Sequence, residues 1–282
     1  MLRIRNSWEL AKVSWSVRRS DKSLAVFPTL AAVVDLVVVG IFAGLVALTG
    51  VDSAHGGALK GIAYVIIAVG YIAMAFVTTY FLGALVHGAN EALEGRRAEL
   101  SDCFAAANAR LHRILPWALI QATVSMILQV LENVRGVGPI LRALLGTAWA
   151  VLTFLTIPII MFEDRGPIDA LERSGSLLKR SWGENLTAQF GFGFLTLIAA
   201  VPAFVLFGAG GATGNLAAVI VTGAIGAAWF VIVLLVVSAL TGIYRTALYR
   251  FAVDGVAPPA FANADLQHAL GPRQQRRSGF GF

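Results

Sequence analysis

Long apolar stretches separated by short polar connections dominate the chain. A helix needs about 20 predominantly apolar residues to cross the hydrocarbon core of a bilayer. Six stretches reach this length, at residues 24–48, 59–86, 114–134, 139–162, 186–207 and 216–251. The pattern predicts an all-α, polytopic membrane helix bundle with six transmembrane helices. We assign residues 1–257 to this single transmembrane domain and expect residues 258–282 to form a disordered cytoplasmic tail.

The connections on one side of the membrane carry a second pattern. Apolar residues recur at helical spacing at about 4–19, 99–113 and 167–182, each time before an odd-numbered span. Polar residues occupy the opposite faces, as in helices that lie in the membrane interface. The first and third segments share a series at identical spacing, in which Ser7, Leu10, Lys12, Ser14 and Trp15 correspond to Ser174, Leu177, Lys179, Ser181 and Trp182. The chain therefore divides into three repeats, each an amphipathic interfacial helix followed by a membrane hairpin.

Composition and charge agree with the membrane class. Hydrophobic residues make up 57% of the chain and charged residues 13%, whereas a soluble domain carries about 25% charged residues. Lys and Arg concentrate in alternate connections and at both ends of the chain, which predicts that both termini lie in the cytoplasm of a plasma (inner) membrane. Because these basic residues stand in short stretches between spans, we expect membrane lipids as partners and no nucleic acid.

One carboxylate stands near the middle of the first span. A charged group in hydrocarbon is costly, so Asp35 is expected to face the bundle interior or to be protonated. One interpretation is a proton or cation site. The other is a structural carboxyl that is hydrogen-bonded to Tyr64, Tyr71 or Thr78 of the second span. The absence of a visible partner charge in mid-membrane favours the second interpretation.

The third span carries a polar face. Gln121, Ser125, Gln129 and Glu132 are spaced by four, four and three residues, which places them on one side of a helix. This face could line a cavity or a substrate path. Alternatively, these side chains could join helices through hydrogen bonds, with Glu132 near the outer surface beside Arg135, and polar side chains commonly have this role in lipid.

Other residue types that often carry function have simpler interpretations here. Tryptophans near the predicted inner boundaries are expected to be interface anchors, namely Trp8, Trp15, Trp117 and Trp182. Pro158 and Pro202 interrupt the fourth and fifth spans and are expected to kink them. No two histidines stand at metal-ligand spacing, and no GxSxG, P-loop or HExxH pattern occurs. We therefore expect no enzymatic activity, no cofactor and no metal.

Two segments carry a family resemblance. Residues Asn6 to Pro28 read NSWELAKVSWSVRRSDKSLAVFP, and residues Phe162 to Leu186 read FEDRGPIDALERSGSLLKRSWGENL. The first resembles the start of an uncharacterised bacterial integral membrane family common in actinobacteria. The second resembles the membrane domain of some glycerophosphoryl diester phosphodiesterases and its stand-alone relatives. The resemblance implies six helices with recurring interfacial helices and no established activity, and the phosphodiesterase barrel with its metal-binding carboxylates has no counterpart in these segments.

Two functions compete at this point. The leading hypothesis is a non-enzymatic membrane protein that organises lipid or a partner membrane complex through its cytoplasmic-face helices. The partner could be another membrane protein or a second copy of the chain in a homo-oligomer. The candidate headgroup or partner contacts are Lys12, Trp15, Lys179, Arg180 and Trp182. The alternative is a transporter or permeability factor for a small or lipidic molecule. A cavity that unites Asp35 with Gln121 and Gln129 would favour transport, and a dry bundle in which these groups bond one another would not.

Overall fold

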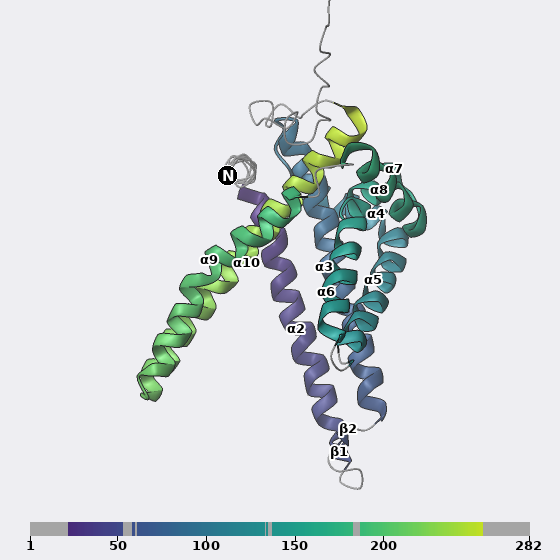
Figure 1. Ribbon diagram of the computed structural model, residues 1–282. Helices are drawn as coiled ribbons and strands as arrows, with labels where there is room; N and C mark the ends of the chain where they lie inside the picture. Colours follow the sequence, from purple (N-terminus) through teal and green to yellow (C-terminus); the bar gives the residue numbers. More distant parts are fainter. Residues whose placement is uncertain are drawn as a thin grey trace, which may run out of the picture.

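The computed structural model describes residues 22–52, 58–59, 61–132, 134, 137–182 and 187–255 (Figure 1). The predicted first interfacial helix (4–19), with Lys12 and Trp15, lies outside these residues, as does the predicted tail (258–282). The side chains of Arg180 and Trp182 also lie outside the described part.

The described residues are helical apart from one short ladder and the short connections between the helices. A 3-10 turn, η1 (Lys22–Ala25), leads into α2 (Val26–Thr49). The two-residue strands β1 (Val51–Asp52) and β2 (Ala58–Leu59) pair antiparallel. The other helices follow as α3 (Gly61–Leu93), α4 (Leu100–Ala109), α5 (Leu111–Glu132), α6 (Gly138–Leu152), α7 (Thr156–Glu163), α8 (Pro167–Trp182), α9 (Thr187–Ala212) and α10 (Leu216–Asp254).

Five segments of the described chain are long and apolar enough to cross a membrane. They are Ser23–Thr49, Gly61–Leu93, Leu111–Glu132, Gly138–Glu163 and Leu216–Asp254. Each corresponds to a predicted span. Within the described part of the chain, the predicted fifth span (186–207) overlaps only a shorter apolar helix, Thr196–Ala212. The sixth crossing, the three-hairpin arrangement and the orientation of the termini therefore stay predictions. Apolar side chains such as Leu36 and Leu48 are 73% and 84% exposed, as expected for helices that face lipid.

The helices form two groups. α2 packs along α3, and α5 packs along α6 and against α3. α9 packs along α10, and this pair leans away from the other spans (Figure 1). The two groups are joined chiefly where the second half of α10 contacts α3, α7 and α8, and the buried core lies in this region. We call this end of the molecule, where α4 and α8 also lie, the charged end, because its ion pairs link Glu94 with Arg250 and Asp164 with Arg110.

The two predicted interfacial segments that the structure describes pack on the bundle itself. Residues 167–182 form one helix, α8, with the predicted bounds. The segment 99–113 is not one helix, because α4 ends at Ala109, Arg110 makes a turn, and α5 begins at Leu111. The apolar faces of both helices are buried in the core, through Cys103 and Ala107 of α4 and through Leu177 and Leu178 of α8. Their amphipathic patterns are therefore satisfied largely within the chain.

The fourth span is broken in two, as its proline predicts. Pro158 has no N–H, and its ring would clash with the carbonyl of Phe154 in a regular helix. The chain tightens instead, with the Phe154 N–H bonded to the Val151 carbonyl at 3.1 Å. The N–H of Leu155, which this turn frees, donates to Oγ of the fully buried Ser174 in α8 at 3.2 Å. By contrast, α9 continues through Pro202.

Removing this hydroxyl is expected to weaken the packing of α8. In the Ser174→Ala variant, the buried N–H of Leu155 loses its acceptor, which should cost ~1–3 kcal/mol. The matched control is Ser176→Ala, because the Ser176 hydroxyl is exposed and bonds only the Arg173 carbonyl of its own helix. Thermal unfolding of the purified protein in detergent checks this. Equal midpoints for the two variants would contradict the role of Ser174.

Candidate functional site

A cavity of about 570 Å³ lies between α2, α3, α5, α6, α7 and α10, and we call it the central cavity. This volume lies within the range of small-molecule sites, roughly 300–1,000 Å³. Much of the lining is apolar, including Pro28, Leu82, Leu85 and Ile157. The polar lining comes from Asp35, Thr78, Thr79, Gln121, Ser125, Thr153, Ser238, Thr241 and Arg245.

Asp35 enters the cavity from α2 with half of its carboxyl group satisfied. The hydroxyl of Thr78 in α3 donates to Oδ2 at 3.2 Å, so one of the three predicted partners is confirmed. Tyr64 and Tyr71 are instead 60% and 37% exposed. The second oxygen, Oδ1, is buried and has no hydrogen-bond partner. A buried acceptor without a partner is costly, so this atom is available to a ligand.

A pair of tryptophans fixes the wall opposite Asp35. Nε1 of Trp149 in α6 donates to Oε1 of Gln121 in α5 at 2.7 Å. The Trp149 ring stacks on Trp117, with ring centroids 6.1 Å apart. Trp117 is 1% exposed, so its prediction as an interface anchor is wrong. Its ring packs inside the bundle, against Trp149 and the other side chains of the buried core.

The predicted polar face of α5 divides between two environments. Gln121 and Ser125 line the central cavity. Gln129 and Glu132 do not line it, and Glu132 pairs with Arg142 of α6. Its predicted neighbour Arg135 lies outside the described residues. The face thus contributes both to a cavity and to helix pairing.

Arg245 of α10 is the site residue that the sequence did not reveal. Its guanidinium carbon lies 4.7 Å from the centre of the Phe154 ring. Its Nε is buried without a hydrogen-bond partner. Among the described residues no carboxylate lies within ion-pairing distance of it, whereas Arg250, five residues further on, pairs with Glu94. The available signal was its position among the apolar residues Ile243, Tyr244 and Ala247, nine residues before the helix ends.

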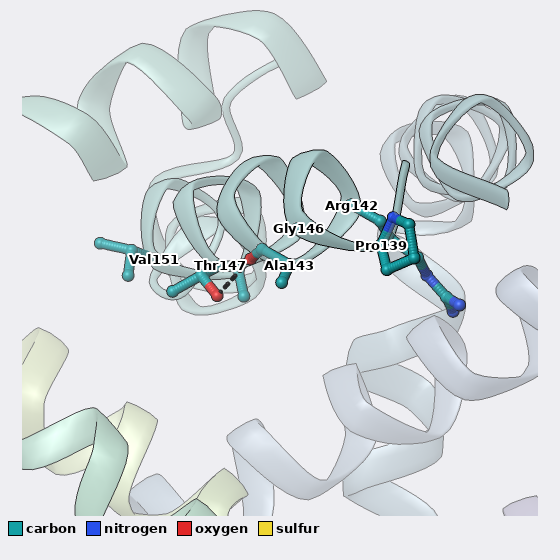
Figure 2. A pocket seen from close by; sticks show the side chains of 7 residues that line it. Pro139, Arg142, Ala143, Gly146, Thr147 and Val151 are labelled. Carbon is teal, nitrogen blue, oxygen red and sulfur yellow. Dashed lines mark hydrogen bonds between the residues drawn. The ribbon is translucent and has the colours of Figure 1, made fainter. Parts of the chain in front are cut away.

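A second hollow, of about 480 Å³, runs along α6, and we call it the α6 hollow. Figure 2 shows its side chains gathered along one side of the helix, from Pro139 to Val151. The Thr147 hydroxyl is satisfied by the Ala143 carbonyl at 2.7 Å, which leaves this wall largely apolar. Ala150 lines both hollows. Together they follow one face of the fourth span through its break to Ile157.

Ion pairs close the charged end around these helices. Asp164 has a left-handed backbone, with φ 51°. Its Oδ1 lies 3.5 Å from Nε of Arg110 and 3.7 Å from Nε of Arg113. Glu163 accepts from Arg173 of α8 at 3.4 Å and from the Tyr249 hydroxyl of α10 at 3.2 Å. These contacts tie α5, α7, α8 and α10 together.

Lys179 is the predicted headgroup or partner contact whose side chain the structure describes. Lys179 is exposed on α8, where a lipid headgroup or a partner can reach it. In the part of the chain that the structure describes, no group of three or more His, Cys, Asp or Glu side chains is placed to hold a metal ion.

Comparison with known proteins identifies a family and no activity. No curated protein and no solved structure matches the chain. No match links it to the glycerophosphoryl diester phosphodiesterases or to actinobacteria, so that resemblance stays a prediction. One family model matches residues 61–258. This range includes Gln121, Ser125 and Arg245, and it begins after α2 and Asp35. Because the match covers well over half of its residues, the chain belongs to DUF6159, a family of unknown function.

Proposed function

We propose that the chain binds a small or lipidic amphiphile in the central cavity and moves it through the membrane as a transporter or permeability factor. The observation that carries this proposal is the gathering of Asp35, Gln121, Ser125 and Arg245, from three helices, around one cavity. Ionisable side chains are expensive at membrane depth and are typically kept at substrate pathways.

The hydrogen bonding in the cavity favours a ligand site over helix pairing. If these groups served only to join helices, they would bond one another. Thr78 and Trp149 do bond Asp35 and Gln121. However, Oδ1 of Asp35 and Nε of Arg245 are buried without partners. A ligand with polar groups would satisfy both atoms.

We propose that the two hollows belong to one path. They share Ala150, and the junction lies beside the break at Thr153 to Leu155 in the fourth span. Broken helices at membrane depth recur in transporters, where the interrupted backbone lines the binding site. The charge distribution supports a cytoplasmic position for the charged end, so the proposed path runs from the central cavity along α6 toward the other side of the membrane.

The hypothesis of a lipid or complex organiser has less support. It requires apolar helix faces that are free to enter the interface, whereas α4 and α8 bury theirs through residues such as Cys103 and Leu177. The exposed Lys179 favours the hypothesis. Organisation of a partner or of lipid thus stays a second candidate, carried by Lys179 and by the predicted contacts Lys12, Trp15, Arg180 and Trp182.

A flux assay tests the proposal. The purified full chain is placed in phosphatidylcholine vesicles with short-chain fluorescent phosphatidylcholine or phosphatidylglycerol, and dithionite then destroys the dye that reaches the outer leaflet. We expect the protein to accelerate the loss of inner-leaflet dye for at least one of these lipids. A rate equal to that of protein-free vesicles for both lipids would contradict the proposal.

Asp35→Asn is expected to lower this flux at least ~10-fold, a barrier increase of about 1.4 kcal/mol. The amide oxygen still accepts from Thr78, so the midpoint of thermal unfolding should not change. The charge, and with it the capacity to carry a proton or a cation, is lost, and the free acceptor Oδ1 is replaced by an amide donor. The control is Asp102→Asn, the same change at an exposed position of α4. Normal flux in Asp35→Asn would exclude proton coupling at this residue.

A further inference from the structure

The guanidinium of Arg245 is in an unusual state for a membrane helix. A charged side chain at this depth is normally paired with an acid or with backbone carbonyls. The Phe154 ring covers one face of the guanidinium at 4.7 Å. On the edge of the guanidinium that carries the N–H donors, the Nε–H has no hydrogen-bond acceptor. A stacked guanidinium with a free edge is the arrangement that binds planar or tetrahedral anions through parallel hydrogen bonds.

The surroundings of Arg245 fit one end of an amphiphile. Ser238, Thr241 and Arg245 are spaced by three and four residues, which places them on one face of α10. At 1.5 Å per residue, Arg245 lies about 13 Å inside the end of the helix, and its Nε is buried. The same cavity continues over Leu234 and Leu235, which offer an apolar wall for an alkyl chain.

We infer that Arg245 binds the anionic headgroup, a phosphate or a carboxylate, of the amphiphile that occupies the central cavity. This inference rests on the proposed function and names its substrate class. The ligand anion supplies the counter-charge that Arg245 does not receive from the described chain. The Gln121 amide is a further donor in the same cavity, and Asp35 discriminates against ligands that would place a second anion beside it.

Tryptophan fluorescence provides the test, because Trp117 and Trp149 line the cavity. The other four tryptophans, Trp8, Trp15, Trp182 and Trp229, are replaced by phenylalanine so that only these two report, and this background serves as the wild type. The full chain in phosphatidylcholine nanodiscs is titrated with dodecyl phosphate, dodecanoate and dodecanol, each brominated on the chain so that it quenches nearby tryptophans. The wild type is expected to bind the phosphate or the carboxylate at least ~10-fold more tightly than the alcohol. Arg245→Gln should remove this preference and leave alcohol binding unchanged. Arg250→Gln, on the same helix but paired with Glu94 outside the cavity, should retain it.

Each outcome separates the inference from the proposed function. If Arg245→Gln retains the preference for the anion, the inference is overturned while binding in the cavity stands. If no brominated amphiphile quenches the wild type, both fail. If Arg245→Gln does not fold, Arg245→Lys replaces it, because lysine keeps the charge but cannot form the parallel hydrogen bonds of a guanidinium. Equal affinity of the wild type for dodecyl phosphate and dodecanol overturns the inference without any variant. If inorganic phosphate alone displaces the brominated dodecyl phosphate, the ligand is a free anion, and the inference of an amphiphile is overturned.

Discussion

Ala150→Phe is expected to stop most of the flux. Ala150 is the residue that the central cavity and the α6 hollow share, so a phenyl group there fills the junction of the proposed path. We expect the transbilayer rate to fall at least ~10-fold, which corresponds to a barrier increase of about 1.4 kcal/mol. The change adds volume to a hollow and not to a packed core, so the midpoint of thermal unfolding should shift little.

The same helix offers a matched control for this variant. Ala148 is exposed, stands two residues before Ala150, and lines neither hollow. Ala148→Phe introduces the same side chain on another face of α6 and should leave the flux unchanged. If Ala150→Phe transports lipid at the same rate as Ala148→Phe in the dithionite assay, the lipid does not pass Ala150 and the proposed path is wrong.

Trp117→Ala is expected to have the largest effect on stability. The indole of Trp117 is 1% exposed, lies in the core of the charged end and stacks on Trp149. Truncation of a large buried side chain in a soluble protein costs ~3–5 kcal/mol through lost contacts and the cavity that remains. The loss of contacts applies equally within a bundle whose helices are held by packing. The midpoint of thermal unfolding in detergent should fall by many degrees.

Trp229→Ala is the control for this change. Trp229 is 44% exposed on α10, and its Nε1 donates to the Ala199 carbonyl of α9 at 2.9 Å. Lipid or detergent can fill the space that the truncated side chain leaves, so the midpoint should move much less. Similar losses in both variants would show that Trp117 is not part of a specifically packed core.

The sequence predicts the helices well because length and apolarity decide them. The span predicted at 114–134 overlaps α5 (Leu111–Glu132) up to Glu132, and the long last span at 216–251 lies within α10 (Leu216–Asp254). α8 has the predicted bounds because Gly166 and Pro167 set its start. The break in the fourth span follows from the missing N–H of Pro158. In each case a local rule determines the outcome.

The candidate site is only partly predictable for the same reason. The spacing of Gln121 and Ser125 places them on one face, and the depth of Asp35 indicates a partner on the second span, which Thr78 supplies. No local rule brings α10 beside them, so the apolar neighbours of Arg245 set it apart from a charge that fixes topology but do not show that it lines this cavity. Likewise, Ser174 belongs to the predicted repeat, but its bond to Leu155 depends on how α8 meets the broken span.

Thiol labelling tests most directly whether a water-accessible cavity lies within the membrane bundle. The chain has a single cysteine, Cys103, which is buried, so Cys103→Ala provides a cysteine-free background. In this background Ser125→Cys places a thiol in the central cavity, and Ala148→Cys places one on the lipid side of α6. We predict that a small water-soluble methanethiosulfonate labels Ser125→Cys in the folded protein in nanodiscs, that dodecyl phosphate slows this reaction, and that Ala148→Cys is not labelled. A Ser125→Cys thiol that stays unlabelled until the protein unfolds would mean a dry, sealed bundle and would contradict the account.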